Sequence, residues 1–329
     1  MKMMKYLIAG AALACALVAT SAYADDANTN TMLVSTGGAS GTYYQLVDQM
    51  KNFCADVVSI DQWKDDSGKL SSGSPQNLDN ILNNQSELAV VQTDALFLRN
   101  NVDPDNVSRI LTLIPLHSEE VHLIAKSAPR SKGGVMGFGA TQYTLNDLAD
   151  LNGLKVGAWG GSVVTAKVIN FNANAGMQVV EYPDQPTAQA ALDKGDIDAI
   201  LAVGGQPLGW VKTLTPDYKL LSIDASIAKQ LEQIYRPASL SYSNLGQSAI
   251  PTVAGDALLV TRDYKSKNRV NQLLALRKCI VDRIDDIRDT RGTHPKWQEI
   301  DPTKASKWPH IFEAPAATTA AAPATGSGG

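Results

Sequence analysis

The sequence predicts an α/β fold organised as two lobes. Short apolar runs alternate with segments of helical spacing along most of the 329 residues, and this alternation is typical of mainly parallel sheets. The length suits two domains, and a content of 44% apolar residues is ample for buried cores. A Ser-, Gly- and Pro-rich break at residues 127–141 separates two series of elements, so we expect a crossing between lobes near it.

The first series opens on a strand at residues 31–34, a glycine-rich turn at residues 35–44 and a helix from residue 45. Such a junction aims free backbone N–H groups at an anion, and the helix N-terminus adds a partial positive charge. The turn matches neither G-x-G-x-x-G nor the P-loop pattern, so it lacks the residues of a nucleotide site. Taken alone, it predicts either an anion site or a structural βα loop.

The same construction occurs twice more along the chain. A strand at residues 88–91 ends at Gln92 and Thr93 before a helix, and a strand at residues 155–158 leads through residues 160–162 into another helix. In an open parallel sheet, these junctions gather at the carboxyl edge, where ligands bind. Further strands are predicted at residues 57–60, 109–116, 120–125, 179–182, 197–203, 219–223 and 257–260, and further helices at residues 77–82, 145–150, 186–193 and 268–288.

The first 24 residues have the features of a secretory signal. Lys2 and Lys5 form a basic n-region, residues 6–19 an apolar h-region, and residues 22–24 an A-x-A cleavage site. The h-region is too short to span a bilayer. We therefore expect cleavage after residue 24 and a mature protein in the periplasm.

The charge of the chain argues against nucleic-acid binding, and its cysteine content predicts a disulfide. Without Lys2 and Lys5, 27 basic and 33 acidic side chains remain, a formal charge of −6 with no basic run, so nucleic-acid binding is not expected. Loss of Cys15 with the signal leaves Cys54 and Cys279, which in an oxidising compartment most simply form one disulfide. The alternatives are two separately buried thiols and a lipoprotein signal ending at Cys15, which the preceding residues match poorly.

These motifs, taken in order, resemble the TAXI family of solute-binding receptors, which serve tripartite TRAP transporters. The opening S-T-G-G-A-S-G-T-Y-Y at residues 35–44 looks like the signature of that family. Six further stretches fall in the family's order: residues 88–94 (L-A-V-V-Q-T-D), 119–125 (E-E-V-H-L-I-A), 150–156 (D-L-N-G-L-K-V), 160–162 (G-G-S), 195–199 (G-D-I-D-A) and 205–207 (G-Q-P). The resemblance covers about residues 31–262.

The resemblance implies a type II periplasmic-binding-protein fold, in which two α/β lobes joined by a hinge close around a ligand in the cleft between them. It implies that the ligand is a small organic anion, commonly an amino acid or a dicarboxylate such as glutamate or 2-oxoglutarate. The expected domains are a signal peptide at 1–24, a first lobe at 25–122, a second lobe at 123–260, C-terminal helices at 261–313 that return toward the first lobe, and a disordered tail at 314–329.

The family's binding positions fall on the three junctions, and the expected partners are membrane subunits of a TRAP transporter. Adjacent helical residues do not share a face, so only one of Tyr43 and Tyr44 is expected in the cleft, and the family position selects Tyr43. We expect a monomer with no catalytic residue, cofactor or metal ion. The expected ligand-binding residues are Thr36, Gly37, Gly38, Tyr43, Gln92, Thr93, Ser162, Val163, Thr165 and Gly205.

The chain departs from the family pattern at two places that bear on the ligand. Val163 stands where members often have Gly, and His117 and Ser118 stand before Glu119 where many have Tyr-Pro. A guanidinium fork could clamp a carboxylate directly. The candidates are Arg99, Arg109 and Arg236, which the sequence does not rank.

Three alternative functions have weaker support. A metal site at His117, Glu119 and His122 is not expected, because strand alternation puts His122 on the opposite face and the spacing is not H-E-x-x-H. An exported hydrolase using Ser162 lacks the second glycine of G-x-S-x-G. A sensory protein that uses the same cleft to signal to a partner is the nearer alternative.

Overall fold

The structure is a computed structural model that describes residues 31–39, 41–132 and 141–312, all within one compact unit, Thr31–Gly329. The predicted signal peptide at 1–24 and the predicted tail at 314–329 lie outside the described residues. None of the helices in the described ranges combines the length and hydropathy needed to cross a membrane.

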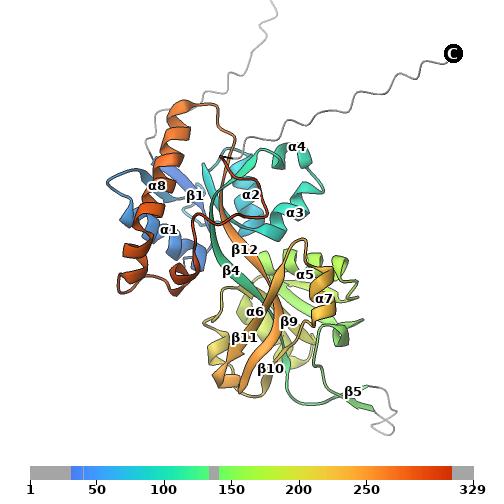
Figure 1. Cartoon of the computed structure of the whole chain (residues 1–329). Coiled ribbons are helices and arrows are strands. Elements are labelled where there is room, and N and C mark those ends of the chain that lie inside the picture. Colours follow the sequence, from blue (N-terminus) through green and yellow to red (C-terminus); the bar gives the residue numbers. More distant parts are fainter. Residues whose placement is uncertain (1–30, 40, 133–140, 313–329) are drawn as a thin grey trace, which may run out of the picture. The chain divides into compact units, whose positions relative to one another are not determined.

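Two long antiparallel strands, β4 (Ile110–Lys126) and β12 (Gln247–Arg262), run side by side through the middle of this unit (Figure 1). The main sheet has ten strands with the order β2-β1-β3-β12-β4-β9-β7-β8, and β10 and β11 add to β4 and β12. Parallel strands flank the long pair on both sides: β1 (Thr31–Ser35), β2 (Ser59–Gln62) and β3 (Leu88–Gln92) on one, and β7 (Lys155–Trp159), β8 (Gln178–Tyr182) and β9 (Ala199–Gly204) on the other.

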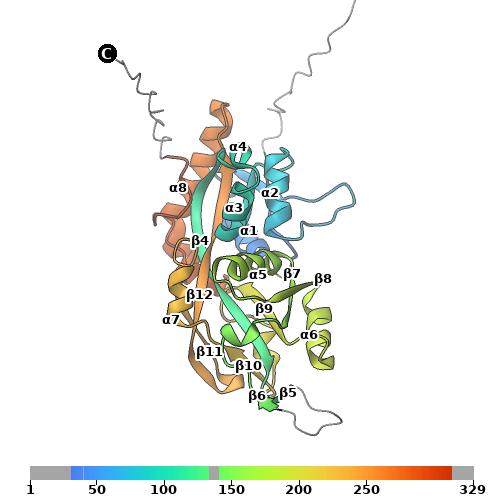
Figure 2. The ribbon, with the colours of Figure 1, turned by 90° about the vertical axis from the view of Figure 1, so that its right-hand side faces the viewer.

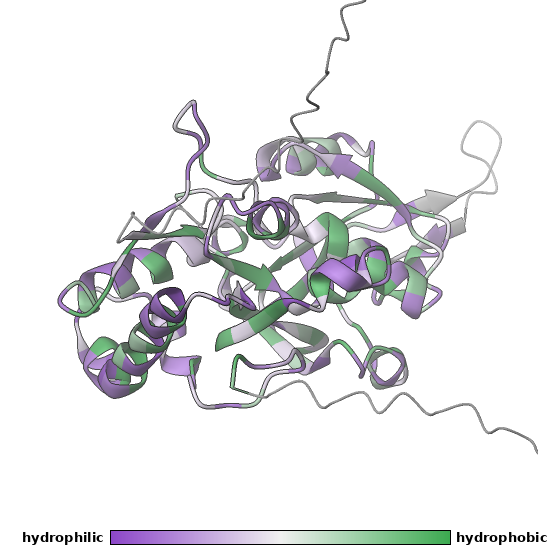
Figure 3. Cartoon of the chain, turned by 90° about the horizontal axis from the view of Figure 1, so that it is seen from above, coloured by the Kyte–Doolittle hydropathy of each residue, from purple (hydrophilic) through white to green (hydrophobic). Residues whose placement is uncertain are grey.

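Helices cover these strands, so the inner strands are buried and read as continuous apolar runs in the sequence. All five residues of β3 are buried. Seen from above, apolar residues concentrate on the central strands and polar residues on the outer faces of the helices (Figure 3). The helices are α1 (Thr42–Phe53), α2 (Ser74–Leu82), α3 (Thr93–Asn100), α4 (Pro104–Val107), α5 (Gly161–Asn172), α6 (Gln185–Lys194), α7 (Ala225–Gln230) and α8 (Lys267–Asp289).

The remaining described elements are short. They are the strands β5 (Arg130–Lys132), β6 (Thr141–Tyr143), β10 (Tyr218–Leu221) and β11 (Arg236–Tyr242), and 3₁₀ turns at Ala149–Leu151, Val211–Thr213, Ser243–Leu245 and Pro295–Glu299.

The buried apolar side chains divide into two sets of clusters. One set is built from residues 32–116 and 257–308, and the other from residues 121–253. This is the predicted two-lobed α/β architecture. Because the clusters change over inside β4 and β12, we propose residues 117–120 and 254–256 as the hinge. Neither segment lies within the break at 127–141, near which the crossing was expected.

One predicted helix, at residues 145–150, is wrong. Only a 3₁₀ turn forms, at Ala149–Leu151, because Asp147 pairs with Ser222 in a parallel β-bridge that holds the start of the segment in an extended conformation. The Leu148 N–H donates to the Ser222 carbonyl, and the Ser222 N–H donates to the Asn146 carbonyl. The strands predicted at 109–116 and 120–125 are parts of the single strand β4.

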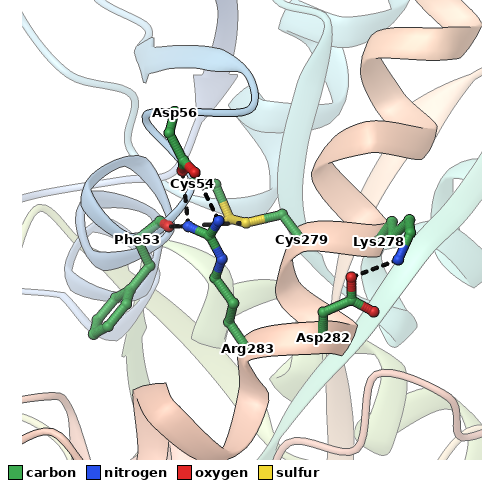
Figure 4. Close-up of a disulfide and its surroundings, with 7 residues drawn as sticks. All are labelled: Phe53, Cys54, Asp56, Lys278, Cys279, Asp282 and Arg283. Atoms are coloured by element: carbon green, nitrogen blue, oxygen red, sulfur yellow. Dashed lines mark hydrogen bonds and ion pairs between the residues drawn. A yellow bond between two sulfur atoms is a disulfide. The ribbon is translucent and has the colours of Figure 1, made fainter.

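The predicted disulfide is confirmed, and it fastens α8 to the end of α1 (Figure 4). Cys54 and Cys279 are 225 residues apart in sequence, and their Cα atoms are 6.0 Å apart. One turn further along α8, the Arg283 guanidinium donates two hydrogen bonds to the Asp56 carboxylate, at 2.8 and 2.7 Å, and a third to the Phe53 carbonyl. The C-terminal part of the chain is thereby held on the first lobe.

Replacing both bridged cysteines by serine should lower the free energy of unfolding by about 2–4 kcal/mol, because the bridge closes a long loop and restricts the unfolded chain. Urea unfolding of wild type and of the double variant Cys54→Ser/Cys279→Ser measures this. Wild type treated with a reductant is the control and should behave like the variant. Equal unfolding midpoints for oxidised protein and variant would contradict a stabilising role.

Candidate functional site

Glycine turns from both lobes meet at the carboxyl ends of the strands. A methyl group placed on Gly37 would lie 3.8 Å from the Cα of Gly73, and one placed on Gly73 would lie 3.9 Å from the Gly161 nitrogen. A methyl group on Gly161 would come within 2.3 Å of Gln92 Oε1. The three predicted junctions therefore lie together, and the turn before α2 at Gly73, which the sequence did not single out, lies among them.

A group of polar side chains from both lobes surrounds this meeting point, and we call it the interlobe cluster. Two of the helices that contribute to it, α3 of the first lobe and α5 of the second, lie next to each other in both side views (Figures 1 and 2). Its members are Tyr43, Ser74, Gln92, Asp94 and Glu119 from the first lobe and hinge, and Thr165 and Tyr235 from the second lobe.

Asp94 is the member that links the lobes directly. The Thr165 hydroxyl on α5 donates to Asp94 Oδ2 at 2.5 Å, and the Tyr235 hydroxyl donates to the same oxygen at 2.7 Å. All three side chains are buried, and burial raises the pKa of the Asp94 carboxyl. Within the described part of the chain, Asp94 Oδ1 has no hydrogen-bond partner, so this oxygen can accept a further donor.

Tyr43 and Glu119 form the second part of the interlobe cluster. The Tyr43 hydroxyl donates to Glu119 Oε2 at 2.5 Å. Burial, and then the nearby Asp94 and Glu120 charges, raise the pKa of Glu119 to about 8, although the bond from Tyr43 opposes this shift. Burial also raises the pKa of Tyr43 well above 10. Tyr43 is therefore a hydrogen-bond donor at neutral pH, and Glu119 takes up a proton readily.

The two histidines of β4 have different surroundings. His117 packs edge-on against the Tyr43 ring with centroids 5.9 Å apart, and burial lowers its pKa to about 3. His122 instead bonds to the Tyr242 hydroxyl and to the Glu120 carbonyl, each at 2.9 Å. The described residues hold no group of three or more His, Cys, Asp or Glu side chains arranged for a metal ion.

The C-terminal region adds a buried lysine beside the hinge. Lys296, in the 3₁₀ turn Pro295–Glu299, is only 3% exposed, and its Nζ lies 2.6 Å from Glu299 Oε1 and 3.5 Å from Glu120 Oε2. Glu120 also accepts the Gln206 N–H at 2.6 Å. A methyl group on Gly205 would lie 2.1 Å from Lys296 Cε, so the missing side chain at Gly205 makes room for the lysine stem.

The expected ligand residues fall into two groups in this conformation. Gly37, Tyr43, Gln92 and Thr165 lie at the meeting point of the lobes, and Gly38 is exposed at the opening turn. The others make contacts with protein groups: Thr36 Oγ1 donates to Gln62 Oε1 at 2.7 Å, Thr93 Oγ1 donates to the Asp256 carbonyl at 2.8 Å, Ser162 Oγ accepts the Val203 N–H at 3.0 Å, and Val163 is buried in the second-lobe core.

Each arginine considered as a carboxylate clamp is paired with an aspartate. Arg236 lies at the hinge, where it also donates to the Ser118 hydroxyl. The pairs are Arg99 with Asp79 at 2.9 Å, Arg109 with Asp263 at 3.0 Å, and Arg236 with Asp256.

The expected ligand-binding residues did not include Ser74, Asp94, Glu119 and Tyr235 of the interlobe cluster, nor Lys296 beside it. Asp94 is the last residue of the motif at residues 88–94 and directly follows Gln92 and Thr93. An acidic residue in the first turn of a helix, next to a predicted junction, could have indicated its position in the site. Tyr235 and Lys296 lie in segments without a motif, so only their tertiary contacts reveal them.

A protein-family model, that of the NMT1-like family, matches residues 34–308. The chain belongs to the NMT1-like family. The match includes every member of the interlobe cluster, both bridged cysteines and Lys296. No curated protein matches the sequence of this NMT1-like protein significantly.

Several solved structures are similar to this NMT1-like protein at low identity. An amino acid ABC transporter substrate-binding protein from Streptococcus pneumoniae, bound to L-arginine, is 14% identical, with 76% of this chain and 88% of that chain covered and a TM-score of 0.45. An arginine-specific periplasmic binding protein from Salmonella typhimurium is 12% identical, with 83% and 99% covered and a TM-score of 0.48. Arginine-bound truncated ArgBP from T. maritima is 12% identical, with 77% and 96% covered and a TM-score of 0.44. At these identities and TM-scores, the similarity does not show which ligand this chain binds.

Replacing Glu119 by glutamine should change how stability depends on pH. The folded pKa of Glu119, about 8, lies above its ordinary value of 4.5, so the folded state holds a proton that the unfolded state releases. The contribution of Glu119 to the free energy of unfolding is therefore fully present below about pH 4.5 and is lost as the pH rises through about 8. Urea unfolding at both ends of this pH window measures the effect. The free energy of unfolding of Glu119→Gln should increase relative to that of wild type as the pH rises.

The exposed Glu181 offers a matched control, since Glu181→Gln makes the same change on β8. That variant should keep a constant stability difference from wild type across the window. A constant difference for Glu119→Gln as well would contradict the raised pKa of Glu119.

Proposed function

We propose that this NMT1-like protein is a periplasmic solute-binding receptor that closes its two lobes around a small organic solute. The observation that carries the proposal is the bonding of one buried carboxylate, Asp94, to two hydroxyls of the other lobe, Thr165 and Tyr235. These bonds form only when the lobes are together. A solute that contacts both lobes selects this closed state, which is how a two-lobed receptor signals that it is loaded.

The charges around the meeting point favour a solute with both an anionic and a cationic end. The turn that leads into α1 has Gly41 at its N-cap without a side-chain bond, and backbone N–H groups at a helix N-terminus suit a carboxylate. Asp94 keeps a carboxylate oxygen without a partner among the described residues, and this oxygen can accept a hydrogen bond from an ammonium group, while Glu119, with its pKa raised to about 8, is mainly protonated at neutral pH. Of the expected ligands, an amino acid therefore fits better than a dicarboxylate.

The proposed recipient of the solute is a set of TRAP membrane subunits, and the proposed compartment is the periplasm. The order of motifs from residues 35–44 to residues 205–207, which resembles the TAXI family, supports the recipient. The n-, h- and cleavage regions within residues 1–24 support the compartment.

Amino acids should raise the melting temperature of the purified protein, and Asp94→Asn should weaken their binding at least about tenfold, because a hydrogen-bonded charge contributes about 1.5–3 kcal/mol. Isothermal titration calorimetry measures the affinity. Asp105→Asn, the same change at an exposed position on α4, is the control and should bind as wild type does.

A folded protein that showed no thermal shift with any amino acid or dicarboxylate would rule out this function. Wild-type affinity in Asp94→Asn would remove Asp94 from the site.

A further inference from the structure

An apolar pocket of about 260 Å³ lies between the two lobes, next to the interlobe cluster. Its walls come from three helices, α2 and α3 of the first lobe and α5 of the second, so it is formed by both lobes. α2 contributes Pro75 and Leu78, α3 contributes Ala95, Leu98 and Arg99, and α5 contributes Val164. Val102 also lines the pocket and is 78% exposed, so the pocket opens to solvent beside it.

The pocket and the interlobe cluster share their backbone. On each of the three helices, a pocket residue is the direct neighbour in sequence of a polar residue of the cluster. Pro75 follows Ser74, Ala95 follows Asp94, and Val164 precedes Thr165. The pocket and the interlobe cluster therefore lie beside each other along the same three helices.

The only charged side chain in the lining, Arg99, is already neutralised. Its Nη1 lies 2.9 Å from Asp79 Oδ1, which is also on the first lobe. An acidic side chain of a solute would have to compete with Asp79 for the guanidinium. An apolar side chain meets only apolar walls, and such a lining with few polar groups is typical of pockets for apolar ligand groups.

We propose that this pocket receives the side chain of the solute, and that the solute is an amino acid with an apolar side chain, such as a branched or aromatic one. The inference rests on the proposed function, because it places the ammonium group at Asp94 and the carboxylate at the turn before α1. An apolar cavity of 150 Å³ accommodates benzene, so 260 Å³ holds about ten non-hydrogen atoms. An isobutyl or a benzyl group fits within that limit, and it touches Val164 of the second lobe as well as α2 and α3.

Calorimetric titration with alanine, leucine, phenylalanine and glutamate tests the proposal. Each buried CH₂ group strengthens binding about fourfold, so leucine should bind about fiftyfold more tightly than alanine. Val164→Phe, which fills the pocket from a half-buried position, should weaken leucine binding at least about tenfold. Alanine binding should change little, because alanine leaves the pocket nearly empty. Val57→Phe, the same change at a 45% exposed position outside the pocket, should leave every affinity unchanged.

A second variant tests the role of Arg99 by a gain of binding. Asp79→Asn removes the charge that neutralises the Arg99 guanidinium, so glutamate should bind more tightly and leucine should not. Asp105→Asn is again the exposed control.

The outcomes separate the two proposals. Tight glutamate binding with weak leucine binding, or unchanged leucine affinity in Val164→Phe, overturns the apolar subsite and leaves solute binding intact. Leucine binding that falls in Val164→Phe but not in Asp94→Asn supports the pocket and overturns the role of Asp94. Binding of none of the four amino acids overturns the apolar subsite together with the preference for an amino acid.

Discussion

The antiparallel pairing of β4 with β12 is the constraint on which the rest of the structure depends. Both strands run through the two lobes, and each lobe builds its parallel strands outward from this pair. Near the change between lobes, the register shifts between Asp256 and Leu258, and such an irregularity bends and twists a strand. Because Glu119 and Glu120 lie on β4 at the same level, the hinge also positions the acidic groups of the site.

The acidic groups at the interface are costly for the fold. Burying a carboxyl is unfavourable unless partners compensate, and a raised pKa reports incomplete compensation. Burial raises the pKa values of Asp94, Glu119 and Glu120, and Asp94 keeps an oxygen without a partner among the described residues. Replacing buried charged groups by apolar ones is often neutral or stabilising, so the presence of these acids supports the proposal that they act in solute binding.

The interlobe cluster and the apolar pocket give two different environments on the same three helices. Near the start of each helix, one polar residue belongs to the interlobe cluster, and an apolar residue next to it in sequence lines the pocket. Adjacent helical residues project about 100° apart, so a single helix start can serve both. A solute that uses both environments contacts each lobe through polar and apolar groups, which couples its recognition to closure.

The sequence by itself determined the alternation of strands and helices, the three turn junctions, and the disulfide, since these follow from local periodicity and from having two cysteines after the predicted signal. The helix predicted at residues 145–150 is wrong because Asp147 pairs with the distant Ser222 in a β-bridge, which local periodicity does not encode. Only the tertiary structure decided which distant side chains form hydrogen bonds with one another. Tyr235 lies 141 residues from Asp94 in sequence, and their bond exists because β4 and β12 bring the lobes together. No local pattern encodes such a contact, because its energy arises only after distant elements have packed.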